Sequence, residues 1–206
     1  RTDQPNGDRR SPLNDAARDP AGTLLGREQA DWLTERLTTS AATWNVLAQQ
    51  VMMARVDREA GPKEAFSMDQ WPGYEFERQR VLRHFHEARV ANPVVLTGDI
   101  HSHWANELRL PSGQGPGGPV AVEFVGTSIS SGGDGTARPA YLDALQRENP
   151  FVKFHNAERG YVLCEVSPGR WETQFRTVEY VTRPGAPVQS RARFTVEAGR
   201  SQLLPG

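Results

Sequence analysis

The stretch of sequence that decides the fold is Val94-Val95-Leu96-Thr97-Gly98-Asp99-Ile100-His101-Ser102-His103. Its first four residues are apolar or β-branched, which predicts a strand buried on both faces, as in a sheet with parallel strands. A glycine ends this run, and a carboxylate and an imidazole follow it two residues apart. If the backbone stays extended, alternate side chains share one face, so Asp99 and His101 would project together.

This carboxylate and imidazole pair indicates part of a metal site at the end of a buried strand. Carboxylate oxygens suit calcium, magnesium, manganese or ferric iron, and a neutral imidazole suits zinc or iron. The alternative is a strand-end turn in which Asp99 caps the next segment and the two histidines, His101 and His103, are solvated. Short metal motifs often match by chance, so the pattern alone leaves both interpretations open.

Along the chain, helices alternate with strands first and strands predominate later, which predicts an α/β fold with a β-rich C-terminal end. Apolar residues recur with helical spacing over residues 27–39 and 74–90. Strands are predicted at residues 44–53, 94–97, 120–125, 161–166, 171–181 and 193–196. Ser167-Pro168-Gly169-Arg170 predicts a hairpin turn. The composition of residues 1–23 predicts an irregular segment, and residues 24–206 are predicted to form a single unit.

The composition excludes several classes of function. Lys and Arg together number 24 and Asp and Glu 25, so the net charge of −1 creates no field that attracts nucleic acid or an anionic membrane. No apolar run reaches the ~18 residues of a transmembrane helix. The single cysteine, Cys164, excludes an internal disulfide, and the alternation around it predicts a half-buried core position rather than a ligand.

Further blocks of sequence keep a common order along nearly the whole chain. They are Leu25-Gly26-Arg27-Glu28-Gln29-Ala30-Asp31-Trp32-Leu33, Trp44-Asn45-Val46-Leu47-Ala48-Gln49-Gln50-Val51, Glu123-Phe124-Val125-Gly126-Thr127-Ser128-Ile129, Arg159-Gly160-Tyr161-Val162 and Val196-Glu197-Ala198-Gly199. Together with Thr97-Gly98-Asp99-Ile100-His101-Ser102, these blocks resemble the PhoD-like alkaline phosphatases. Several blocks in register are far more specific than any single one.

The resemblance implies a calcineurin-like metallophosphoesterase that hydrolyses phosphate mono- or diesters with a metal-bound hydroxide. It implies ferric iron and calcium as cofactors, with other divalent metals as alternatives. Asp99 and His101 match metal ligands of the family's Gly-Asp-Ile-His segment. The implied fold is the C-terminal half of a sandwich of two mixed sheets flanked by helices. The implied location is extracytoplasmic, either periplasmic or secreted.

The family's earlier metal ligands come from segments of the Gly-Asp-x-x-Tyr and Asp-Asp-His type, which this sequence lacks. We therefore expect residues 24–206 to be the C-terminal portion of a PhoD-like domain. Its N-terminal remainder would be a partner, and this portion alone would have little or no activity. Without that remainder, the strands at residues 94–97 and 120–125 would have open edges. The alternative is a non-catalytic binding module that keeps the fold with an incomplete metal site.

Three further polar residues are candidates for a supporting or substrate-binding role. His103 follows His101 by another two-residue step, and its alternative is a partly exposed structural histidine. Asn156 lies in a polar cluster with Arg159, whose guanidinium would suit a phosphate oxygen or a structural salt bridge. Gly160 predicts a bulge or a close approach of two backbones.

Overall fold

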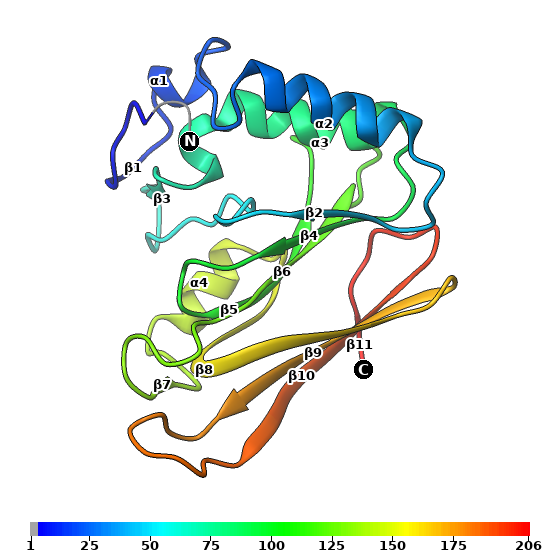
Figure 1. The fold of residues 1–206 in the computed structure, drawn as a ribbon. Coiled ribbons are helices and arrows are strands. Elements are labelled where there is room, and N and C mark those ends of the chain that lie inside the picture. The colour runs from blue at the N-terminus through cyan, green and yellow to red at the C-terminus, as the bar shows by residue number, and fades with distance from the viewer. Residues whose placement is uncertain (1–3) are drawn as a thin grey trace.

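In the computed structural model, which describes residues 4–206, nine strands form one mixed sheet (Figure 1). The strand order is β11-β10-β9-β8-β5-β6-β4-β2, and β7 pairs with β8. The strands are β2 (Asn45–Ala48), β4 (Pro93–Thr97), β5 (His103–Leu108), β6 (Ala121–Val125), β7 (Gly135–Thr136), β8 (Val152–Val166), β9 (Arg170–Val178), β10 (Val188–Glu197) and β11 (Leu204–Pro205). The neighbours β2, β4 and β6 are parallel, and the remaining pairs are antiparallel. The expected α/β class with a mixed sheet is confirmed.

Two helices cover one face of this sheet, α2 (Arg27–Thr39) and α3 (Glu75–Glu87) (Figure 1). The helix predicted at residues 27–39 is confirmed, and the one predicted at 74–90 is preceded by the 3-10 helix η1 (Trp71–Tyr74). Both helices follow the apolar periodicity, because their buried residues lie on the face turned toward the sheet. No helix among residues 4–206 is long and apolar enough to cross a membrane.

The long strand β8 connects two halves of the sheet. Its first part, around Phe154, pairs with β5, and its second part, around Val162, pairs with β9. The two halves then pack against each other, since Phe124 of β6 lies 6.2 Å from Phe175 of β9 between ring centroids. The chain has two hydrophobic cores. The first core fills the space between the sheet and the helices, and the second core, which contains Phe124 and Phe175, fills the space between the two halves of the sheet. The half that contains β9 is antiparallel throughout.

Several elements differ from the prediction. The strand predicted at residues 44–53 ends at Ala48, after which the chain continues as a buried loop. Strand β5 and the short helix α4 (Leu142–Glu148) were not predicted, because β5 buries polar residues and α4 has only seven residues. The predicted irregular segment includes β1 (Arg10–Ser11), which pairs with β3 (Phe66–Ser67), and helix α1 (Asp15–Arg18). Its first three residues lie outside the described ones, and the boundary at residue 23 stays a prediction.

The expectation of open sheet edges at residues 94–97 and 120–125 is wrong. Strand β4 lies between β2 and β6, and β6 lies between β4 and β5, so both are internal. The edge is formed by β2, where the side chain of Val46 is 45% exposed. Apolarity alone does not order strands, since the crossover through α3 that joins β2 to β4 decides which of the two comes outermost.

Candidate metal centre

The loop at residues 98–102 connects β4 to β5 at the carboxyl ends of the parallel strands. The expected extended backbone is wrong here, because φ is 69° at Asp99 and 55° at His101. The Ile100 N–H donates to the Gly98 carbonyl at 2.8 Å, which fits a γ-turn of the rare positive-φ type centred on Asp99. Two of the four non-glycine residues with positive φ in the described chain lie in this loop. Such strain persists only where surrounding structure holds it, and it clusters at functional sites.

The side chains of Asp99 and His101 are exposed and have no hydrogen bond or ion pair with any residue among 4–206. The predicted alternative of an Asp99 cap is therefore not formed in this part of the chain. Both donors are free to bind a ligand. Within the described chain no group of three or more His, Cys, Asp or Glu side chains is placed to hold a metal ion. The chain thus offers two donors, and their role as ligands stays a prediction.

His103 occupies a different environment from His101. Its ring is fully buried at the start of β5, with Nδ1 accepting a hydrogen bond from the Thr127 N–H at 3.3 Å. The edge of the ring meets Phe175, with centroids 5.2 Å apart. Burial lowers the pKa of His103 to about 4, so the ring is neutral and carries its proton on Nε2. The sequence suggested that His103 shares a face with His101 or is partly exposed, and neither expectation is met.

Asn156 is buried in β8. Its side-chain amide donates to Glu158 Oε2 at 2.8 Å, and its carbonyl oxygen accepts the Glu158 N–H at 2.9 Å. It therefore orders its own strand, and a contact with substrate stays a prediction.

The buried Arg159 holds the glycine-rich loop at residues 126–135. Its guanidinium donates to Ser128 Oγ and to the Ser131 carbonyl, both at 2.7 Å, and to the Ala157 carbonyl. No ion pair to Arg159 is found among residues 4–206, so the predicted salt bridge is not formed there. Since its guanidinium already makes these three hydrogen bonds, its phosphate role stays a prediction.

The structure also reveals a buried carboxylate that sequence reasoning did not single out. Glu123 in the middle of β6 is fully buried, and this burial raises its pKa while four hydrogen-bond donors oppose the shift. Its oxygens accept from the backbone N–H of Met53 and Ala54, from Thr97 Oγ1 and from Asn106 Nδ2, at 2.6 to 3.0 Å. The available signal was a glutamate inside the apolar run Ala121-Val122-Glu123-Phe124-Val125.

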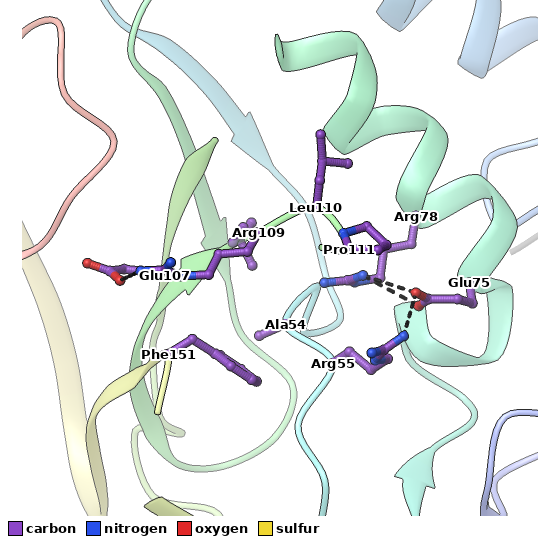
Figure 2. Close-up of a pocket in the computed structure, with 10 residues that line it drawn as sticks. Ala54, Arg55, Glu75, Arg78, Glu107, Arg109, Leu110, Pro111 and Phe151 are labelled. Carbon is purple, nitrogen blue, oxygen red and sulfur yellow. Dashed lines mark hydrogen bonds and ion pairs between the residues drawn. The ribbon is translucent and has the colours of Figure 1, made fainter. Parts of the chain in front are cut away.

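Two cavities bear on the position of the site. Asp99 lines a cleft of about 630 Å³ that runs along β2 and includes the exposed Trp32 and Val46. A smaller pocket of about 160 Å³, shown in Figure 2, lies near the end of β5, far along that strand from the loop at residues 98–102. Its Glu75 pairs with Arg55 and Arg78, at 3.0 and 3.3 Å. Because these charges are paired with one another, this pocket is a weaker candidate for a ligand-binding site than the cleft beside Asp99.

His155 lies in a buried aromatic cluster next to the candidate centre. Its ring centroid is 4.0 Å from that of Trp104, Nε2 is 3.2 Å from Tyr141 Oη, and Nδ1 is 3.2 Å from the His103 carbonyl. Burial is the largest influence on His155 and lowers its pKa from 6.5 to about 4. The cluster therefore depends on a neutral imidazole.

This shift predicts a loss of stability in acid. Between pH 6.5 and about 4 the unfolded chain binds a proton at His155 that the folded chain does not, so the free energy of unfolding falls as the pH falls through this window. The expected loss from one such histidine is roughly 3 kcal/mol. Urea unfolding between pH 4 and 7 measures the slope. His155→Gln should reduce the slope but not abolish it, because the pKa of His103 is lowered in the same way, and His86→Gln, at an exposed position on α3, should leave it unchanged. An equal slope in His155→Gln and the unsubstituted protein would contradict the assignment.

The chain, with this mixed sheet and these covering helices, is a portion of a PhoD-like phosphatase domain, and it belongs to that family. The family model, described as PhoD-like phosphatase, matches residues 1–175. The chain is 41% identical over 203 residues to alkaline phosphatase D of Bacillus subtilis (strain 168), covering 98% of this chain and 35% of that protein. A solved structure described as "Structure of PhoD" matches with a TM-score of 0.92 and 40% identity, covering 100% of this chain and 39% of that one. The chain thus spans about a third of the length of this curated relative.

Proposed function

We propose that this chain is part of a metal-dependent phosphatase that hydrolyses phosphate mono- or diesters, with Asp99 and His101 among its metal ligands. The observation that carries the proposal is their geometry. Both donors are exposed and lack protein partners among residues 4–206, on a positive-φ loop at the carboxyl ends of parallel strands. Membership of a phosphatase family supports phosphate-ester hydrolysis as the reaction at this site.

The donor types fit the metals that the family resemblance implies. A carboxylate is a hard ligand suited to calcium and ferric iron, and an imidazole binds iron readily. Calcium takes about six to eight ligands, so two side chains cannot complete a site by themselves. We infer that the remaining ligands come from parts of the protein outside this chain, since the curated relative is longer.

Metal ions held there would polarise the phosphoryl group and lower the pKa of a bound water, which is the chemistry that ester hydrolysis needs. The contribution of this chain is to hold Asp99 and His101 in place at the end of the sheet. The cleft beside Asp99 gives access to this edge and has room for a substrate or for another segment of the protein. The choice between mono- and diesters, and the extracytoplasmic location, stay predictions.

A non-catalytic binding module is the second candidate. It is favoured by the lack of a group of three or more metal-binding side chains within residues 4–206. The two candidates differ in what they predict for the full-length protein, because only an enzyme turns over a phosphate ester.

Metal removal distinguishes them. We expect the full-length protein to hydrolyse an aryl phosphate monoester or diester, and to lose at least about 100-fold in kcat/KM after chelation because no ion remains to stabilise the developing charge. Ferric iron and calcium should restore the rate. The 206-residue chain assayed beside it should stay near background. Full turnover by metal-free protein would refute metal dependence, and metal-loaded protein without turnover would favour the binding module.

A further inference from the structure

A line of buried and partly buried hydrogen bonds runs along the first core to the start of the candidate metal loop. The Trp71 indole N–H donates to Gln49 Oε1 at 3.0 Å, and Gln49 Nε2 donates to Thr97 Oγ1 at 2.7 Å. The Thr97 hydroxyl in turn donates to Glu123 Oε1 at 3.0 Å. Thr97 is the last residue of β4 and directly precedes Gly98, where the loop begins. The side chain of Thr97 therefore joins the core to the loop.

Glu123 is the central acceptor of this line. Its four donors come from three different segments: the loop after β2, the end of β4, and β5. No ion pair to Glu123 is found among residues 4–206, so its carboxylate is held by hydrogen bonds together with a coulombic attraction to the buried Arg78. An apolar side chain would fill this position at a smaller cost of desolvation. The arrangement is therefore better explained by the precise relative placement of three segments than by stability.

The backbone at this point is held on both sides by the residues that follow the neighbouring strands β2 and β6. The Gly98 N–H donates to the Gln50 carbonyl at 3.2 Å, and the Gly126 N–H donates to the Thr97 carbonyl at 2.8 Å. The next residues of the loop include two positive φ values, which are conformations that cost free energy. Such a loop keeps its conformation only if its starting point is fixed by the surrounding structure.

We propose that Thr97 and Glu123 are positioning residues for the metal loop, acting through Asp99 and His101. Their hydrogen bond fixes the end of β4, and Gln49 holds the same hydroxyl from the other side. Loss of this bond lets the start of the loop move and separates the two donors from their ligand geometry. This inference rests on the proposed function, because it assigns the network a purpose only if Asp99 and His101 bind metal.

Thr97→Val in the full-length protein tests the proposal, since valine keeps the shape of threonine and removes the hydroxyl. We expect metal affinity, measured by titration of the metal-free protein with calcium or ferric iron, to weaken by about 10- to 100-fold, the range found when groups that orient metal ligands are removed. Amide exchange at residues 98–102 of the metal-free protein should become faster. The value of kcat should fall more than KM changes. Thr97→Ser, which keeps the hydroxyl, should restore all three.

Thr173→Val is the matched control. Like Thr97, Thr173 is a buried strand threonine with a hydrogen-bonded hydroxyl, which here accepts from the Trp171 indole N–H at 2.8 Å, but it lies beside the second core. It should lower stability without changing metal affinity or loop exchange. If Thr97→Val fails to fold, Gln49→Met at a partly exposed position removes the neighbouring hydrogen bonds and should weaken metal affinity in the same direction.

The outcomes separate this inference from the proposed function. If Asp99→Asn loses metal while Thr97→Val and Gln49→Met match the Thr173→Val control, only the positioning role is overturned. If Asp99→Asn keeps its metal and turnover, the ligand assignment fails and the positioning role fails with it. Weaker metal binding and faster loop exchange in Thr97→Val, both reversed in Thr97→Ser, support the proposal.

Discussion

Asp99→Asn and His101→Ala in the full-length protein are each expected to lower kcat/KM for phosphate-ester hydrolysis by about 1000-fold or more, because each removes a donor from the proposed metal site. The midpoint of denaturant unfolding should stay near that of the unsubstituted protein. Both side chains are exposed and have no partners among residues 4–206, so their replacement opens no cavity and breaks no hydrogen bond there. Metal content measured by elemental analysis should fall together with activity.

The controls for this pair are chemically identical changes elsewhere. Asp31→Asn on α2 and His86→Ala on α3 replace exposed side chains of the same types away from the loop. They should leave turnover and metal content unchanged. Near-normal turnover and metal content in both Asp99→Asn and His101→Ala would show that the loop is not a metal site.

Gly160→Ala should cause a large loss of stability, because two backbones meet at this glycine. A Cβ atom at Gly160 would lie 1.9 Å from the Arg176 carbonyl oxygen, and φ there is 156°, a region that disfavours side chains. Backbone atoms cannot move aside as a flexible side chain can, so β8 and β9 would have to separate. We expect the free energy of unfolding to fall by about 3 to 5 kcal/mol.

Equilibrium denaturation checks this expectation against a second glycine in the same hairpin. Gly169, in the turn between β8 and β9, has no atom within 4 Å of an added Cβ and no positive φ. Gly169→Ala should therefore change stability by less than about 1 kcal/mol. A Gly160→Ala variant as stable as Gly169→Ala would mean that the two backbones do not approach as closely as described.

Several elements could be predicted from the sequence because their signal is local. The helix at residues 27–39 follows from apolar spacing, and the strand that became β4 follows from an apolar run too short for a helix. The turn between β8 and β9 follows from Ser167-Pro168-Gly169-Arg170, whose Ser167 N–H donates to the Arg170 carbonyl at 2.8 Å. Gly160 was predicted to mark a close backbone approach, and its distance to Arg176 confirms that.

Other features could not be predicted because they depend on residues far apart in the chain. The order of strands placed β2 rather than β4 at the sheet edge. The burial of His103 depends on Phe175, and the anchoring of the glycine-rich loop by Arg159 depends on Ser128 and Ser131. None of these contacts leaves a periodic signal, since each joins segments separated by tens of residues.

For the candidate metal centre, the sequence by itself determined which donors share one loop, because Asp99 and His101 are two residues apart and follow a strand-forming run. It also determined the family, because several blocks keep their order. Only the tertiary structure decided how the two donors are presented. Hydrogen bonds with the residues that follow β2 and β6 hold the end of β4, and the loop after it turns through positive φ instead of remaining extended. A local pattern predicts local conformation only where no distant contact overrides it, and the departure from the extended conformation begins directly after Thr97, which the Glu123 carboxylate, 26 residues away, holds by a hydrogen bond.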